Sequence, residues 1–167
     1  MPNWCAGSLR IRGPVENLKK FITEGLNAYK WECIQMKEVK LERSKWLETG
    51  EDGLGEWFCF KANSLYIEGT SRAFIKTNRN NSPFHYWDDV EDSNNTIIFD
   101  FQQAWNIREE EWVELSCKYG INFRLYGFEC GGEFCREVEV LDGKLTIDKT
   151  IRYNDWDWEC PMPMMGG

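Results

Sequence analysis

The elements predicted along the chain run strand, helix, strand-rich insertion, strand, helix and three strands. This order predicts an α+β protein with a ferredoxin-like split βαβ core. Each amphipathic helix follows a strand, so both would pack on one face of a mainly antiparallel sheet. Asp142-Gly143 is a strong hairpin signal between the last two strands. A length of 167 residues fits one domain, which we place at residues 1–160, with an insertion at about 28–95 and a flexible tail at 161–167.

The first strand and helix meet at Pro14. Alternating apolar residues predict a strand over residues 6–12. Proline suits the first helical position, and Glu16 would lie near the positive end of the helix dipole. Asn27 is expected to end the helix. The apolar stripe that predicts it consists of Val15, Leu18, Phe21, Ile22 and Leu26.

The insertion has a weaker pattern. Apolar runs predict strands at residues 56–61, 65–69 and 73–76. Residues 31–46 are charged and have no clean period, and turn-forming residues predict a loop at 78–83.

The second half of the chain begins with a strand predicted at residues 96–101. Asn106 is the expected N-cap of the second helix, with Glu109 completing a capping box, and Gly120 is the expected stop. The three strands that follow are predicted at residues 121–125, 134–140 and 145–151.

The net charge of −8 and the sequence pI near 4.8 argue against nonspecific binding to a phosphate backbone. They fit a partner with a basic surface, such as an enzyme whose nucleic-acid cleft is lined with Lys and Arg. Ordinary solubility explains the same charge. No apolar run approaches the roughly 20 residues of a membrane span, so we expect a soluble chain without a membrane partner. The start, Met1–Cys5, lacks the basic and apolar regions of a signal peptide, so the mature protein is expected to begin there.

Seven cysteines, an odd number without a secretion signal, predict a reducing cytosol and mostly buried thiols. Cys130 and Cys135 are weak candidates for a structural zinc site, which Cys5 and Cys160 would join if the two termini meet. Zinc sites usually have tighter spacing, so the alternative is two hairpin thiols on opposite arms. We predict no cofactor.

A catalytic constellation is not recognisable. The single histidine, His85, would pair with a cysteine nucleophile only in principle. A solvated or core-edge histidine is the preferred interpretation, because nothing nearby supplies a third, orienting group. We therefore predict that the chain is not an enzyme.

Two acidic clusters, at residues 88–92 and 155–159, allow three interpretations. Their carboxylates would bind a divalent metal for phosphoryl chemistry, mimic nucleic-acid phosphates against a basic cleft with tryptophan anchors, or simply be solvated. The candidate partner-binding residues are Asp88, Asp89, Glu91, Asp92, Asp155, Trp156, Asp157 and Trp158.

The abundant aromatic residues raise one further alternative. Some ferredoxin-like sheets stack bases on exposed aromatic side chains. In this chain Lys and Arg are dispersed, no RNP-type motif is present, and the aromatic residues are more simply explained as core.

Several segments together resemble a known family. The opening Met1–Cys5 is followed by Leu-x-Ile-x-Gly at residues 9–13, and Phe-Asp-Phe-Gln-Gln-Ala-Trp occupies 99–105. Trp-Val-Glu-Leu-Ser at 112–116 and the Glu129-containing turn at 126–134 complete the set. These motifs resemble plasmid and phage proteins with a YubB-type ferredoxin-like domain.

The resemblance fails across residues 28–95 and departs from the family pattern at two further points. Gln103 stands where the family usually has Thr, and Asn106-Ile107 where Ser and Pro are common. The family has no established activity, so the resemblance implies a mobile-element origin and supplies no catalytic residue.

These observations predict a non-enzymatic phage or plasmid protein of the bacterial cytoplasm. It would bind and inhibit a host nucleic-acid-targeting defence nuclease in an anti-CRISPR-like manner, by occluding a basic nucleic-acid-binding surface. The expected partner is a CRISPR effector nuclease with its guide RNA, and strong binding to free nucleic acid is not expected. The alternatives are a nucleic-acid-binding ferredoxin-like module and a zinc-stabilised or metal-dependent small protein.

Overall fold

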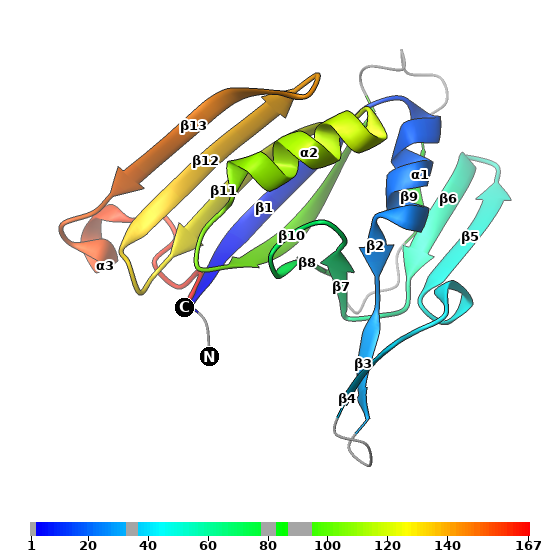
Figure 1. The fold of residues 1–167 in the computed structure, drawn as a ribbon, viewed down its shortest axis with the longest axis horizontal. Coiled ribbons are helices and arrows are strands. Elements are labelled where there is room, and N and C mark those ends of the chain that lie inside the picture. Colours follow the sequence, from blue (N-terminus) through cyan, green and yellow to red (C-terminus); the bar gives the residue numbers. More distant parts are fainter. Residues whose placement is uncertain (1–2, 33–36, 78–82, 87–94) are drawn as a thin grey trace.

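The computed structural model describes residues 3–32, 37–77, 83–86 and 95–167 (Figure 1). The largest element is an eight-stranded antiparallel sheet, here called the main sheet, with the strand order β13-β12-β11-β1-β10-β8-β7-β2. Of the described residues, 50% lie in strands and 19% in helices. The predicted ferredoxin-like α+β core is therefore wrong: the protein is mostly β, with three short α-helices in the described part.

The main sheet is wider than predicted because segments from both halves of the chain extend it. Residues 28–95, expected to elaborate a smaller core, supply β7 (Ser64–Ile67) and β8 (Ala73–Lys76). The predicted end of the first helix supplies β2 (Leu26–Asn27). At the other edge, the predicted hairpin forms β12 (Phe134–Leu141) and β13 (Lys144–Arg152).

Strand β1 (Trp4–Arg12) lies in the middle of this sheet. It pairs antiparallel with β10 (Thr96–Ala104) on one side and with β11 (Asn122–Glu129) on the other. Side chains alternate between the two faces of a strand. Leu9 and Ile11 are buried on the face beneath the helices, whereas Arg10 and Arg12 are exposed on the opposite face.

The helices α1 (Val15–Glu24) and α2 (Glu109–Tyr119) lie on the near face of the main sheet in Figure 1. Phe123 of β11 joins the helices to the sheet, since its ring contacts Phe21 of α1 and Trp112 of α2 at centroid distances of 5.7 and 5.2 Å. Aromatic contacts of this geometry add to the free energy gained by burying the rings. The main hydrophobic core therefore lies between these helices and the sheet.

Both helix boundaries differ from the predictions at one end. Helix α1 ends at Glu24 because, after the cap residue Gly25, Leu26 and Asn27 pair with β7 instead of continuing the helix. Helix α2 begins at Glu109, and the N-cap position is occupied by Arg108, whose side chain makes no capping hydrogen bond. The predicted capping box at Asn106 is therefore wrong. The predicted stop at Gly120 is confirmed: its φ of 63° is left-handed, a conformation that glycine adopts without steric cost.

Two smaller sheets complete the fold. One consists of β5 (Leu47–Asp52), β6 (Gly55–Phe60) and β9 (Phe84–His85), and the short helix η1 (Arg43–Lys45) precedes it. Phe99 of β10 packs against Phe60 and Phe84 of this sheet, at 5.9 and 5.4 Å between ring centroids. The other is the hairpin of β3 (Tyr29–Glu32) and β4 (Lys37–Lys40), which projects at the bottom of Figure 1.

The C-terminal segment packs on the opposite face of the main sheet. The one-turn helix α3 (Trp156–Glu159) places Trp156 in a second small core with Phe128, Cys135 and Cys160. None of the helices in the described ranges is long and apolar enough to cross a membrane.

Candidate protein-interaction surface

Hydrogen bonds draw the two ends of the chain and the β10–α2 connection together. Trp105 donates its backbone N–H to the oxygen of Asn3 at 2.8 Å, and Gly167 donates to the oxygen of Trp4 at 3.1 Å. The indole N–H of Trp156 in α3 donates to the backbone oxygen of Pro163 at 2.9 Å. The residues after β10, the helix α3 and the C-terminal residues therefore lie at one end of the main sheet, where Figure 1 places both termini.

This end of the protein exposes large apolar side chains. Trp158 is 87% exposed, Met164 is 97% exposed and Trp105 is 55% exposed, and Met162 is also exposed. We call these four residues the terminal surface. Single exposed apolar residues are ordinary, so it is the number of large exposed apolar side chains at this end of the sheet that makes it a candidate interaction site.

The two tryptophans of the predicted 155–159 cluster have different environments. Trp156 is buried, and its ring meets Tyr153 at a centroid distance of 5.5 Å, so it holds α3 against the sheet. Trp158 points away from that core. The periodicity of a single helical turn separates the two rings, because residues two positions apart lie on different sides of a helix.

Three carboxylates surround Trp158. Asp155 caps α3 by accepting the backbone N–H of Trp158 at 3.3 Å, and Glu159 accepts the N–H of Asn154 at 2.9 Å. Asp155, Asp157 and Glu159 are all exposed. The turn is therefore held by its own side chains and presents an indole ring with negative charge around it.

The other predicted acidic cluster, Asp88, Asp89, Glu91 and Asp92, lies outside the described residues.

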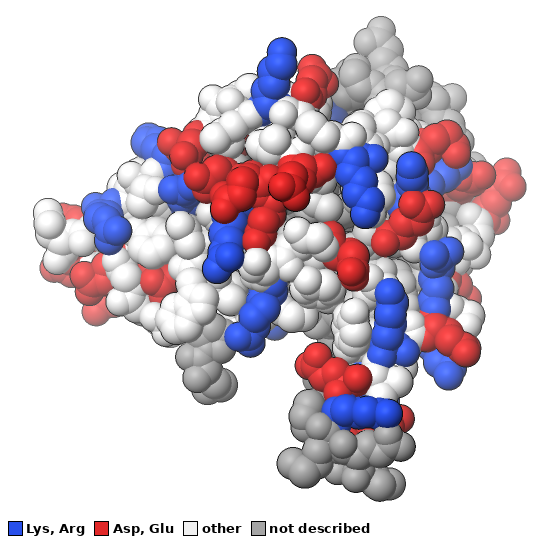
Figure 2. Space-filling model, in the orientation of Figure 1, with Lys and Arg blue, Asp and Glu red and all other residues white. Residues whose placement is uncertain are grey.

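Helix α2 carries a third acidic region that the sequence prediction did not single out. A band of acidic side chains crosses α2 in Figure 2, and the first turn contributes Glu109, Glu110 and Glu111. The run of three glutamates at the start of a predicted helix was the available signal, since acidic residues are favourable at the positive end of the helix dipole. Glu109 is partly neutralised by Arg136 of β12, at 2.6 Å.

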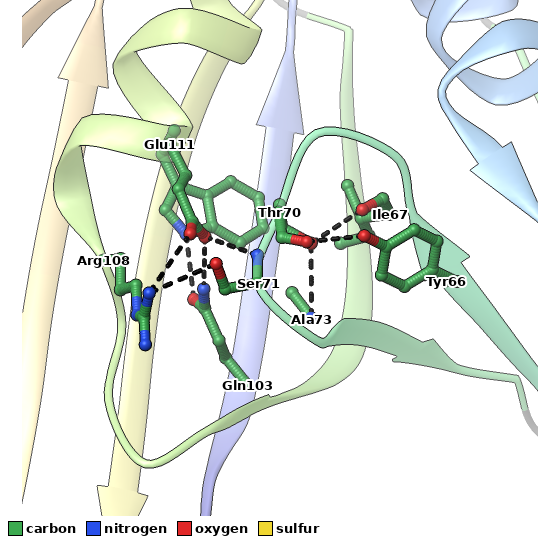
Figure 3. A network of polar contacts seen from close by, with 9 residues as sticks. Tyr66, Ile67, Thr70, Ser71, Ala73, Gln103, Arg108 and Glu111 are labelled. Atoms are coloured by element: carbon green, nitrogen blue, oxygen red, sulfur yellow. Dashed lines mark hydrogen bonds and ion pairs between the residues drawn. The ribbon is translucent and has the colours of Figure 1, made fainter.

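Glu111 belongs to a polar network that fixes the β10–α2 connection (Figure 3). The buried Gln103 donates from Nε2 to Glu111 Oε2 at 2.7 Å, and Gln103 Oε1 accepts the indole N–H of Trp112 at 3.2 Å. The same carboxylate oxygen of Glu111 accepts the backbone N–H of Ser71 at 3.0 Å. Gln103 lies two residues before Trp105. The exposed tryptophan therefore follows a segment that these hydrogen bonds hold in place.

The backbone of Trp105 is in the left-handed region, with a φ of 70°. This conformation is unfavourable for a bulky residue and persists only where the surroundings impose it. Here the hydrogen bond to Asn3 and the Gln103 network impose it. The backbone at Trp105 is therefore held in an unfavourable conformation by its surroundings, at a cost in conformational energy.

Features that would support catalysis or metal binding are sparse in the described part of the chain. Within the described ranges, no group of three or more His, Cys, Asp or Glu side chains is placed to hold a metal ion. His85 Nε2 lies 3.1 Å from Asp52 Oδ2, and the hydrogen bond from His85 lowers the pKa of Asp52 below its ordinary value. This contact joins β9 to the end of β5.

Cys135 lies between two tyrosines. Its Sγ is 3.4 Å from the hydroxyl of Tyr126 and 3.3 Å from that of Tyr153. The hydrogen bond with Cys135, followed by burial, raises the pKa of Tyr126 to about 12 and also raises that of Tyr153. Cys130 packs at the edge of the same small core. The surroundings of Cys135 are thus phenol hydroxyls and apolar groups, which suit a thiol in a core.

Cys5 lies on the helix-covered side of the sheet. Burial, with a smaller contribution from the charge of Glu129, raises the pKa of the Cys5 thiol to about 12. A thiol that stays protonated at neutral pH is neither a good nucleophile nor a good metal ligand.

No known protein family, curated protein or solved structure matches this chain. The similarity to proteins with a YubB-type domain therefore stays a prediction. The arguments for function rest on the surfaces of the molecule itself.

Proposed function

We propose that this chain is a non-enzymatic phage or plasmid protein that inhibits a host nucleic-acid-targeting nuclease. It acts in the bacterial cytoplasm, and its partner is a CRISPR effector nuclease carrying guide RNA. The observation that supports the proposal best is Trp158, a strongly exposed indole ring on a turn that also presents Asp155 and Asp157.

The proposed mechanism is occlusion of a basic nucleic-acid channel. Trp158 and Trp105 act as apolar anchors, because tryptophan is among the residues that contribute most to binding energy at protein interfaces. The carboxylates around Trp158 pair with Lys and Arg of the channel, and the net charge of −8 speeds the encounter with a basic surface. A channel filled in this way has no room for its nucleic-acid substrate.

The carboxylates also give selectivity. Phosphate groups compete for the same basic side chains, so the inhibitor and the nucleic acid exclude each other. The acidic first turn of α2 would repel free nucleic acid from that side of the inhibitor.

The test is a target-cleavage assay with purified CRISPR effector complexes, run with and without the protein. We expect inhibition by the wild-type protein and a loss of at least about tenfold in inhibitory potency for Trp158→Ala, which corresponds to about 1.4 kcal/mol of lost binding energy. Asp157→Lys should weaken inhibition further and slow association, because it reverses a charge beside the anchor.

Two matched controls lie elsewhere on the surface. Leu54→Ala removes an exposed apolar side chain from the β5–β6 turn, and Glu51→Lys reverses an exposed charge on β5. Both should inhibit as the wild type does. If Trp158→Ala and Asp157→Lys inhibit as well as these controls, the proposed occlusion by the terminal surface is wrong.

A further inference from the structure

The face of the main sheet opposite α1 and α2 carries basic and aromatic side chains in separate rows. We call it the open face. The helices and the three-stranded sheet cover the other side, and α3 covers only the corner of the open face formed by β11, β12 and β13. Residues directly opposite one another in antiparallel strands share a face, so the strand register shows which strand residues lie on the open face.

Arginines from two strands meet on the open face. Arg10 of β1 lies directly opposite Arg124 of β11, and Arg12 follows two residues after Arg10 on the same face. Like charges directly opposite in a sheet are unfavourable. Arg124 is balanced, since it forms ion pairs with Glu137 at 2.5 Å and Glu139 at 3.0 Å.

Arg10 and Arg12 are not balanced in this way. Both side chains are exposed, and neither forms an ion pair with any described residue. Arg12 Nε donates to the Thr96 hydroxyl at 2.9 Å. These arginines and Arg124 line a groove of about 150 Å³ together with Asn122 and Glu139, whose carboxylate is paired with Arg124. Two uncompensated guanidinium groups beside a third make the groove suitable for an anion.

One part of the open face has a charge opposite in sign to that of the whole protein. In the rows that cross the sheet at residues 8, 10 and 12 of β1, five cations face three carboxylates. The cations are Arg10, Arg12, Arg124, Lys76 and Lys149, and the carboxylates are Asp100, Glu137 and Glu139. The cations of these rows exceed the carboxylates by two on a chain of net charge −8, which favours a negatively charged ligand at these rows, away from the acidic α3.

A row of aromatic rings crosses the same face farther along the strands, where Trp4 is about 20 Å from Arg10 on β1. Trp4 of β1 contacts Phe74 of β8 at 5.9 Å between ring centroids, Phe74 contacts Tyr66 of β7 at 5.6 Å, and Tyr66 contacts Tyr29 of β3 at 6.1 Å. All four side chains are at least partly exposed, and Tyr29 is 40% exposed. The guanidinium of Arg72 lies 5.6 Å from the centre of the Trp4 ring.

We propose that the open face binds a segment of single-stranded nucleic acid. Unpaired bases stack on exposed aromatic side chains, and their phosphates pair with neighbouring Arg and Lys. On the open face the aromatic row takes the bases of one part of the strand, and Arg10 and Arg12 take phosphates several nucleotides farther along. A duplex fits less well, because its bases are already stacked on each other and cannot reach the aromatic row. This inference uses a different surface from the terminal surface and does not depend on the proposed inhibition.

The sequence did not reveal this face because its cations come from distant segments. The alternation in Leu9-Arg10-Ile11-Arg12 and in Phe123-Arg124-Leu125 was a signal that each arginine leaves the core. Only the pairing of β1 with β11 brings them together.

The test is fluorescence anisotropy of the full chain with a labelled single-stranded RNA of mixed sequence, the matching DNA strand, and the DNA duplex. We expect both single strands to bind more tightly than the duplex. Affinity should fall as salt rises from about 50 to 200 mM, because binding releases counterions from the phosphates.

Two variants and a matched control locate the site. Arg10→Ala with Arg12→Ala should lower affinity about tenfold and reduce the salt dependence by about one to two phosphate contacts. Phe74→Leu keeps an apolar side chain but removes the ring between Trp4 and Tyr66, and should lower affinity about tenfold. The control, Lys20→Ala with Lys118→Ala, removes the same charge from exposed positions of α1 and α2 and should bind as the wild type does.

The proposal is overturned if no single strand binds at low salt, if the duplex binds equally well, or if the arginine and control variants lose affinity equally. It is also overturned if the arginine variant instead loses binding to a protein partner while oligonucleotide binding is unchanged. Trp158→Ala should leave oligonucleotide binding unchanged, so failure of this proposal is distinguishable from failure of the proposed inhibition.

Discussion

Glu129 is a buried carboxylate whose removal should destabilise the β11–β12 turn by a predictable amount. The residue is 4% exposed, and its two oxygens accept the backbone N–H groups of Gly131 at 2.9 Å and Gly132 at 2.6 Å. In Glu129→Gln one oxygen remains as an acceptor, whereas the new NH₂ group faces an N–H donor. One charge-assisted hydrogen bond is lost and two donors are left opposed, which costs about 2 kcal/mol of unfolding free energy.

For a domain of this length, about 2 kcal/mol corresponds to a Tm lower by about 4–8 °C. The assay is thermal unfolding at neutral pH, followed by circular dichroism. Glu133→Gln is the matched control, because Glu133 lies in the same turn, is exposed, and has no side-chain hydrogen bond or ion pair with a described residue. Its Tm should change by no more than about 2 °C. Equal Tm values for the two variants would refute the stabilising role of the Glu129 carboxylate.

Three further predictions concern other parts of the fold. Cys117, which is exposed, should react with a thiol reagent at pH 8 in the native protein, whereas Cys5 should react only on unfolding. A pKa of about 12 leaves about one Cys5 thiol in ten thousand ionised at that pH. Fast labelling that survives Cys117→Ser and maps to Cys5 by peptide analysis would contradict this. Gly7→Ala should prevent folding or lower the Tm by more than about 5 °C in a thermal melt, because the added methyl group would collide with a backbone oxygen of β11. An unchanged melting temperature would show that the pairing of β1 with β11 is looser than described. Asp52→Asn should lower stability at pH 7, because a carboxylate with a lowered folded-state pKa stabilises the fold above its ordinary pKa. The difference from wild type should shrink as the pH falls below about 4, where protonation of Asp52 removes from the wild type the charged contact with His85 that the variant lacks. Denaturant melts at the two pH values check this, and a difference that stays the same at both would show that the charged contact does not contribute.

Local features of the chain were predictable where one segment decided the outcome. The helix starting after Pro14, the stop at Gly120 and the hairpin at Asp142-Gly143 depend on backbone preferences that residues express on their own. The capping box at Asn106 was wrong because that side chain bonds the next backbone N–H instead, at 2.8 Å, and the helix starts three residues later.

The candidate site was predictable only in part. An acidic turn with tryptophans at residues 155–159 was visible in the sequence, and it contains the exposed Trp158. Which of the two tryptophans would be exposed was not visible, because that depends on how α3 meets Phe128 and Cys135 on strands about 20–30 residues earlier. The place of Trp105 beside Asn3 was not predictable, because the backbone hydrogen bond between them joins residues about 100 positions apart.

The sequence by itself determined the alternation of apolar and charged residues in each strand, the two amphipathic helices and the acidic balance of the chain. These follow from the periods of strands and helices and from composition. The tertiary structure alone decided that eight strands join in one sheet, that Arg10 and Arg124 meet on its open face, and that the chain ends lie beside Trp105. The physical reason is that strand pairing joins residues far apart in the chain. Its register follows from the burial of whole faces, which no local segment specifies.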